Sequence, residues 1–188
     1  MKVSELNEEE FSLINEEKLI IRKLFCRYFV KIYDIFFHDK KRYCIMEYLP
    51  GQSLLHSKPE LNFESIWKYI RNLVSAIEYC KFINFYLIFL FQGHEIAQIV
   101  HNKIDYDSLF IDENNLLRLS NFGSTKFIDK NKFLKYDTIN NKSKPIPTPP
   151  EIKKDNFYEG KAFDIWLLGS CLFQMIFKRS FDGQNWYK

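Results

Sequence analysis

The stretch HNKIDYDSLFIDENNLLRLSNFG, residues 101–123, has the layout of a catalytic loop but carries the wrong chemistry for one. His101 opens a polar loop, and two short apolar runs joined by an Asn-Asn turn predict a β-hairpin that ends at a Phe-Gly pair. The positions where such a unit would carry its acidic and metal-binding groups hold Lys103, Ser108 and Asn121. The layout favours a catalytic fold, whereas the side chains argue against ordinary catalysis.

The composition is that of a folded protein. A chain of 188 residues with 46% hydrophobic residues is long enough to bury a core and is usually one domain. Its net charge of +3 is small, and acidic and basic residues are interspersed, so the sequence has no electrostatic footprint for nucleic acid. We expect no nucleic-acid partner.

The sequence favours an intracellular, cytoplasmic protein without a membrane span. Residues 1–11 are acidic and lack the apolar core of a signal peptide. The apolar run 82–91 is about half the roughly 20 residues that a spanning helix needs. The cysteines lack the close spacing of a metal site or a disulfide scaffold, so we expect buried, reduced thiols. They are Cys26, Cys44, Cys80 and Cys171.

Hydrophobic periodicity predicts an ordered series of elements. An acidic first turn and an apolar stripe predict a helix over residues 7–25, and two β-rich runs predict a hairpin over 29–49. Apolar residues at helical spacing predict a helix over 66–80, and the all-round apolar segment 164–177 predicts a buried central helix. The polar, proline-rich segment 124–151 has no clear period and predicts an irregular loop.

These elements and motifs, in this order, resemble the eukaryotic protein kinase domain of the Ser/Thr type. That family has a catalytic loop H-R-D-L-x-x-x-N, followed by D-F-G and A-P-E. The spacing from His101 to Ser108 matches the loop, and residues 121–123 (NFG) and 149–151 (PPE) fall at the later motifs. Residues 158–169 are most similar to the calcium/calmodulin-dependent protein kinase kinases.

The resemblance covers almost the whole chain and implies an α+β, partial protein-kinase-like fold. Residues 1–48 would be a remnant of the small lobe and residues 49–188 an incomplete, mostly helical large lobe. The sequence has no glycine-rich loop before residues 1–3 (MKV), which resemble the end of the third small-lobe strand. We expect a truncated domain that lacks the first strands of the ATP lid and the last helices of the large lobe.

The resemblance also implies positions for a nucleotide. Lys2 would grip the α- and β-phosphates with Glu17 as its partner, although a solvated terminal lysine is an equal alternative. The backbone of Glu47 and Leu49 and the side chain of Leu109 would hold the adenine ring. We expect ATP binding to be possible and weak.

The chemical positions depart from the family pattern. Lys103 replaces the catalytic carboxylate, and a protonated ammonium group cannot accept a proton at neutral pH. Ser108 and Asn121 replace the Asn and Asp that hold Mg²⁺ and offer only neutral oxygens, so magnesium binding would be weak or absent. Asp105, two residues after Lys103, would either supply a carboxylate or pair with Lys103 and hold the loop.

The apolar scaffold of the family is present by position. One stack between the lobes would consist of Ile21, Ile32, His101 and Phe122, with Asp164 anchoring the loop from the central helix. The apolar side chains under an adenine ring would be Leu54, Leu109, Phe110, Ile111, Cys171 and Met175. Ordinary core packing is an equally valid interpretation of both sets, so the fold could persist without catalysis.

The segment 82–92 is longer than the short link that the family places between its helix and its catalytic loop. Its Phe/Ile/Leu/Tyr/Asn bias and its lack of turn or cap signals favour an insert translated from a retained intron. The alternative is that it lengthens the preceding helix and packs on a partner.

Two functions remain open. The first is a pseudokinase that binds or regulates a protein partner, such as a kinase or another signalling component. The alternative is a divergent ATP-dependent Ser/Thr kinase that phosphorylates protein substrates. Thr138 and Ser143 lie where the family carries its activating phosphate, and the sequence does not decide whether either is phosphorylated.

Overall fold

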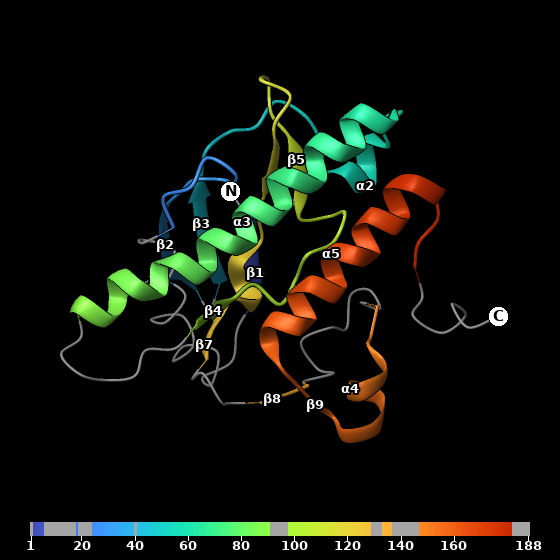
Figure 1. Ribbon diagram of the computed structural model, residues 1–188. Coiled ribbons are helices and arrows are strands. Elements are labelled where there is room, and N and C mark those ends of the chain that lie inside the picture. The colour runs from blue at the N-terminus through green and yellow to red at the C-terminus, as the bar shows by residue number, and fades with distance from the viewer. Residues whose placement is uncertain are drawn as a thin grey trace.

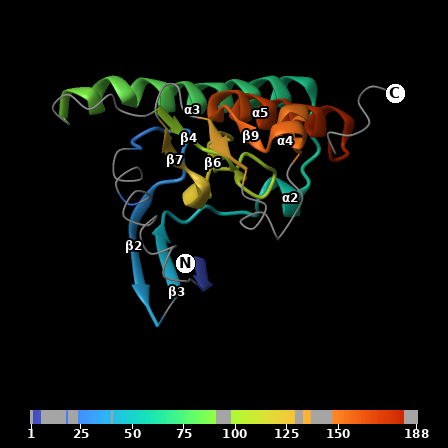
Figure 2. The ribbon, with the colours of Figure 1, turned by 90° about the horizontal axis from the view of Figure 1, so that it is seen from below.

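The computed structural model gives an α+β fold in which two long helices form one layer. A three-stranded sheet lies at the opposite end of the molecule, and short two-stranded sheets lie next to the helices (Figures 1 and 2). The residues that the structure describes are 2–5, 18, 24–39, 41–90, 98–128, 133–136 and 147–181.

The three-stranded sheet is antiparallel, and its strands in spatial order are β1 (Lys2–Glu5), β3 (Lys41–Met46) and β2 (Ile32–His38). The predicted hairpin over 29–49 is confirmed by the pairing of β2 with β3, in which His38 lies opposite Lys41. Ile35 and Cys44 lie opposite each other and are buried, so this face of the hairpin is turned towards the core.

The short sheets pair β4 (Gln98–Val100) with β7 (Lys126–Ile128), β5 (Leu109–Ile111) with β6 (Leu117–Leu119), and β8 (Leu134–Lys135) with β9 (Phe157–Tyr158). The β5–β6 pair confirms the hairpin predicted in the quoted stretch. The irregular loop predicted over 124–151 is wrong in part, because it contains β7, β8 and the start of helix α4 (Pro150–Asp155). Strands this short leave no period in the sequence and form only because distant segments pair with them.

The two long helices are α3 (Phe63–Leu90) and α5 (Gly160–Phe177), and the short helix α2 is Leu54–Ser57. The predicted end of α3 at Cys80 is wrong, because no Gly or Pro interrupts the backbone before Leu90 and Asn84 does not end the helix. The helix therefore continues into the segment 82–92, as the alternative interpretation of that segment requires. Its origin in a retained intron stays a prediction.

The core lies where α3 and α5 pack on the short sheets. Helix α3 buries Tyr69, Ile70, Leu73, Ala76, Ile77 and Cys80, and α5 buries Phe163, Leu167, Cys171 and Met175. Both sets recur at helical spacing, so each helix presents one buried stripe. The prediction that α5 is buried all round is wrong, since Ile165, Ile176 and Phe177 are each at least half exposed.

Among the described helices, α5 is also the one with enough length and apolar character to cross a membrane. It is 44% buried within the protein, and the core helix of a globular domain has the same length and composition. These properties give only weak evidence for a membrane span.

The thiols agree with the expectation of reduced cysteines. None of the four, all in the described part of the chain, forms a disulfide; Cys44, Cys80 and Cys171 are buried and Cys26 is partly buried. The predicted first helix, residues 7–25, lies largely outside the described residues. Within its predicted range Lys18 is helical, whereas the last residues, Leu24 and Phe25, are not.

Candidate active site

The loop that begins at His101 is anchored to the centre of the molecule by Asp164 of helix α5. The two Asp164 carboxylate oxygens accept hydrogen bonds from the backbone N–H groups of His101 and Asn102, each at 2.8 Å. Burial raises the pKa of Asp164 to about 7, against the opposing effect of these two hydrogen bonds. The predicted anchor is confirmed, and we call Asp164 with these two backbone groups the loop anchor.

Asn102 turns the chain at the loop anchor with a left-handed backbone, φ 60°. Asn is among the few residues that adopt this conformation readily. Its side chain donates a hydrogen bond of 3.2 Å to the carbonyl of Ser124, which follows the Phe-Gly pair. This residue therefore ties the loop to the segment after the hairpin.

Aromatic rings connect the loop to the three-stranded end of the molecule. The His101 ring lies edge-on to Phe122 at 5.3 Å between centroids, and Phe122 lies edge-on to Phe29 at 5.4 Å. Burial lowers the pKa of His101 to about 4, so the ring is neutral near pH 7. Ile32 is partly buried against the core, and Ile21 lies outside the described residues.

The sequence does not predict the role of Phe29 in these ring contacts, because there Phe29 is only the first apolar residue of a predicted hairpin. Its 2% exposure follows from contacts with rings that are 50 and 93 residues further along the chain, Tyr79 and Phe122. No local pattern reports contacts of that separation.

The Ser108 hydroxyl is used entirely by the loop itself. Its Oγ donates to the backbone carbonyl of Asp105 at 2.7 Å and accepts from the backbone N–H of Asp105 at 3.0 Å. In return, Asp105 Oδ1 accepts from the backbone N–H of Ser108 at 2.8 Å. Ser108 has no exposed surface, so its hydroxyl is closed off from any ligand in the site.

Lys103 lies at the position where the kinase family has its catalytic carboxylate, and it is partly buried. Its backbone N–H donates to His101 Nδ1 at 3.3 Å, which fixes the turn at the start of the loop. The ion pairs of the described part of the chain include none between Lys103 and Asp105. The Asp105 carboxylate instead stabilises the loop through Ser108, so Asp105 holds the loop by a different contact from the predicted one.

Asn121 precedes the 3₁₀ turn η1 (Phe122–Ser124) and also has a left-handed backbone, with φ 69° and ψ 55°. An Asn fits this conformation with little strain, which explains how the turn survives without an Asp. The side chain is partly buried and carries a neutral amide. A hard cation such as Mg²⁺ prefers charged oxygens to this group.

The described residues do not fit a magnesium site. They contain no group of three or more His, Cys, Asp or Glu side chains that could hold a metal ion. Ser108 is closed off by its own loop, and Asn121 carries an uncharged amide. The two predicted metal positions therefore offer at most one accessible oxygen ligand, and that oxygen is uncharged.

The predicted nucleotide positions are only partly described. The backbone of Lys2 lies in β1 opposite Cys44, and Glu17 lies outside the described residues. Glu47 and Leu49 follow β3 and are partly exposed, so their backbone is accessible to a ligand. Leu109 has no exposed surface, which argues against direct contact with a nucleotide, whereas the neighbouring Phe110 is partly exposed.

A charged network that the sequence did not reveal fixes Glu47. The Arg118 guanidinium contacts the carboxylate of Glu47, donates to the carbonyl of Phe29 at 2.6 Å, and lies 3.2 Å from Asp112 Oδ2. Burial alone would raise the pKa of Asp112, but hydrogen bonds from backbone N–H groups and from Arg118 outweigh it, and the net shift is downwards. The Glu47 side chain therefore serves the structure. Its backbone N–H donates to the Lys31 carbonyl at 2.8 Å, so the Glu47 carbonyl is the backbone group that a ligand could use.

The fold and the site together define a protein-kinase-like domain: a His-led loop anchored to a central helix, with an Asn-Phe-Gly turn packed on it. Residues 1–185 match the family model of the protein kinase domain, and the chain belongs to that family. Kinase domains generally use ATP and Mg²⁺.

Similar proteins are Ser/Thr kinases. A probable serine/threonine-protein kinase of Dictyostelium discoideum is 31% identical over 87% of this chain and 37% of its own length. NUAK family SNF1-like kinase 2 of Rattus norvegicus is 26% identical over 95% of this chain and 26% of its own length. CBL-interacting serine/threonine-protein kinase 19 of Arabidopsis thaliana is 27% identical over 87% of this chain and 31% of its own length.

The chain thus spans between about a quarter and just over a third of the length of these relatives. The family and the Ser/Thr type of the relatives agree with the resemblance seen in the sequence. The finer likeness to the calcium/calmodulin-dependent protein kinase kinases stays a prediction.

Proposed function

We propose that this kinase domain has lost ordinary phosphotransfer and serves as a binding or regulatory module for a protein partner inside the cell. Phosphoryl transfer depends on a carboxylate that orients the substrate hydroxyl and on Mg²⁺ held beside the phosphates. Lys103 cannot replace the carboxylate, and the loss of a general base alone costs about 10²- to 10⁴-fold in rate.

The observation that carries the proposal is the position of Ser108. Its hydroxyl is buried, and both its donor and its acceptor roles are used by the backbone of Asp105. To bind Mg²⁺, the Ser108 hydroxyl would have to break both hydrogen bonds and become accessible, and Ser108 has no exposed surface. The loop is therefore stable in a form that does not hold the metal.

Nucleotide binding without metal is compatible with this proposal. The backbone of Glu47 and Leu49 could bind an adenine ring, with partly exposed Phe110 as apolar surface. We expect weak ATP binding, and we expect the module to act through its protein surface. A kinase or another signalling component is the partner class that fits a regulatory kinase domain.

One observation favours the alternative of a divergent Ser/Thr kinase. Asp105 Oδ1 is held by the Ser108 N–H, but the described residues provide no hydrogen bond to the second oxygen of this carboxylate. That oxygen belongs to a partly exposed side chain and could receive a proton from a substrate hydroxyl.

Phosphotransfer from labelled ATP to a generic peptide separates the two functions. We expect the wild-type chain to give no turnover above its Lys103→Ala variant. Turnover in the wild type that disappears in Asp105→Asn and persists in Lys103→Ala would establish the divergent kinase with Asp105 as its base.

A further inference from the structure

A cavity of about 390 Å³ lies between the short helix α2, the segment that leads into α3, and the C-terminal end of α5. Figures 1 and 2 show these elements together at one end of the two long helices. We call it the α2–α5 cavity. Its volume falls at the lower end of the range of small-molecule sites, so it suits a small ligand rather than a folded partner.

We propose that the α2–α5 cavity binds a small amphiphilic carboxylic acid, with the apolar body of the ligand inside the cavity and its carboxylate at two lysines of the rim. The lining combines apolar side chains with basic ones, and a molecule that has an apolar body and one negative charge interacts favourably with both. The inference does not depend on whether the domain transfers phosphate.

The apolar part of the α2–α5 cavity comes from separate segments of the chain. Leu54 of α2 and Met175 of α5 are 1% and 2% exposed, so they form its floor on the core. Leu55, Pro59 and Leu61 also line it and are partly exposed. An apolar ligand body would remove these side chains from water, which favours binding.

The rim of the α2–α5 cavity carries two lysines at the ends of two helices. Lys58 follows α2 and Lys178 follows α5, and both are exposed. Each has a left-handed backbone, with φ 41° and φ 55°, at the helix end where glycine is the usual residue. Neither lysine forms an ion pair within the described part of the chain, so both charges are available to a ligand.

The lining also holds two uncharged hydrogen-bond donors, Tyr106 and Gln174. The described residues provide no hydrogen-bond partner for the Tyr106 hydroxyl or the Gln174 amide. Burial, with a smaller contribution from Cys171, raises the pKa of Tyr106, so the hydroxyl keeps its proton at neutral pH. The Tyr106 carbonyl accepts from the Leu55 N–H at 3.1 Å, so an occupant would contact the loop that contains the chemical positions.

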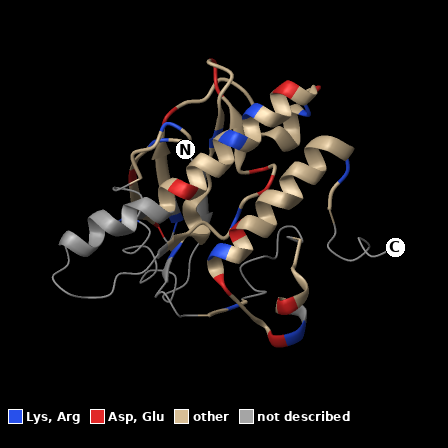
Figure 3. Cartoon of the chain, in the orientation of Figure 1, with Lys and Arg blue, Asp and Glu red and all other residues tan. Residues whose placement is uncertain are grey.

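The charge of the lining selects an anion. Glu60 is its one acidic residue against the two lysines, and no ion pair joins it to either of them among the described residues. The local charge is therefore positive by one unit, which matches a carboxylate better than a doubly charged phosphate. Figure 3 shows basic residues at the C-terminal end of α5 and acidic residues at both ends of α4.

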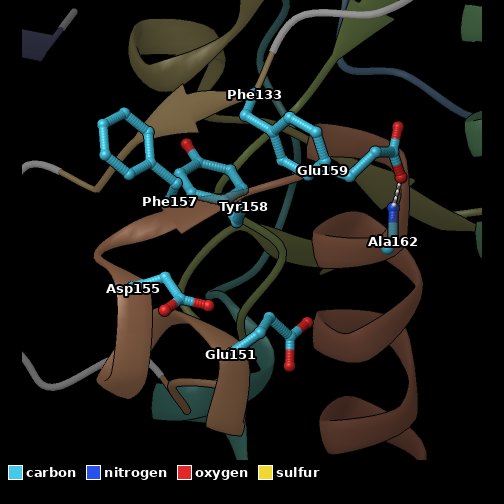
Figure 4. Close-up of a pocket in the computed structure, with 7 residues that line it drawn as sticks. All are labelled: Phe133, Glu151, Asp155, Phe157, Tyr158, Glu159 and Ala162. Carbon is cyan, nitrogen blue, oxygen red and sulfur yellow. Dashed lines mark hydrogen bonds between the residues drawn. The ribbon is translucent and has the colours of Figure 1, made fainter.

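A second cavity, of about 510 Å³, lies beside α4 and the start of α5 and has the opposite charge. Figure 4 shows the carboxylates of Glu151, Asp155 and Glu159 on its lining, which includes no basic side chain. An anionic ligand would be repelled there. Binding that depends on a negative charge would therefore report the α2–α5 cavity.

The test uses octanoate, octanamide and octylammonium, which share an alkyl chain and differ in the charge of the head. Calorimetric titrations with the full chain should show that octanoate binds about tenfold more tightly than octylammonium, with octanamide between them. Equal binding of all three would show that the lysines play no part, and would overturn the proposal.

The double variant Lys58→Gln/Lys178→Gln should lose the preference for octanoate, and Leu55→Trp, which fills the cavity, should weaken the binding of all three ligands. The matched control is Lys135→Gln/Lys154→Gln, which removes the same charge from two exposed lysines outside the cavity lining and should keep the preference. An equal loss in the control would mean that only net charge matters, and would overturn the proposal.

Thermal unfolding separates the loss of the site from a loss of folding. Octanoate should raise the melting temperature of the wild type and of the control, and should leave that of the double variant unchanged. Without ligand, Lys58→Gly/Lys178→Gly should melt no lower than the wild type, because glycine adopts the left-handed backbone without strain. A lower melting temperature would show that both lysines already serve the fold, and would contradict a site for a ligand.

Discussion

The loop anchor and the chemical positions of the same loop differ in how closely they follow the family pattern. At the anchor, Asp164 still accepts both backbone hydrogen bonds and His101 still packs on Phe122. Lys103 and Ser108, within the next few residues, stand where the family pattern has an aspartate and an asparagine. This loop can therefore be held in place by packing and hydrogen bonding, without the aspartate and asparagine of the family pattern.

The largest effect should come from the anchor. Asp164→Ala leaves two buried N–H groups without acceptors, and at about 1–3 kcal/mol for each the chain should lose about 4 kcal/mol of unfolding free energy. Urea denaturation measures this loss. Glu78→Ala, at an exposed carboxylate in the middle of α3, should change stability by less than about 0.5 kcal/mol. Similar values for the two variants would show that the loop is not anchored at Asp164.

The two buried titratable groups of the anchor should respond oppositely to pH. The pKa of His101 falls on folding from 6.5 to about 4, so the unfolded chain binds the proton before the folded chain does. The free energy of unfolding therefore decreases as the pH falls from 6.5 to 4. The pKa of Asp164 rises from 3.8 to about 7, so the folded chain holds the extra proton and stability is lost as the pH rises through that window.

The contribution should reach about 3 kcal/mol for His101 and about 4 kcal/mol for Asp164, and in the wild type the two largely offset each other. Relative to the wild type, His101→Phe should therefore gain stability as the pH falls from 6.5 to 4, and Asp164→Asn should gain stability as the pH rises from 4 to 7. Denaturation curves across this range test both signs. Parallel curves for the wild type and both variants would show that neither group is shifted by burial.

A smaller effect should come from Ser108. Ser108→Ala removes a hydroxyl that holds both backbone groups of Asp105, and we expect a loss of about 1–2 kcal/mol. The matched control, Ser124→Ala, changes a partly exposed serine that contacts Asn102 through its backbone carbonyl only. If Ser108→Ala were as stable as this control, the hydroxyl would be available for other roles, and the contrast between anchor and chemistry would weaken.

The sequence allowed prediction of the parts of this molecule that depend on local pattern and motif spacing. The two hairpins follow from alternating and β-rich runs around polar turns, and the role of Asp164 follows from the family motif. Helix α3 extends beyond its predicted end because the helical spacing of apolar residues over 66–80 is followed by a largely apolar run that has no clear period of its own and no Gly or Pro to stop the helix.

What could not be predicted depends on contacts between distant residues. Arg118 meets Glu47 across 71 positions of sequence, and Phe29 meets Phe122 only through the fold. Phe133 and helix α4, which begins at Pro150, line the same cavity, although a segment without hydrophobic period separates them in the sequence. Even the short-range contact between Ser108 and Asp105 depends on the turn of the loop, which the residue types alone do not determine.

We propose that the loop is stable in a form that cannot hold the catalytic metal. The most direct test of this proposal is thermal unfolding of the chain with ATP, once in excess Mg²⁺ and once in EDTA. We predict the same transition temperature in both, because Ser108 is occupied by its own loop and Asn121 is neutral. A higher transition temperature with Mg²⁺, abolished in Asn121→Ala, would show that the site binds the metal and would contradict the account.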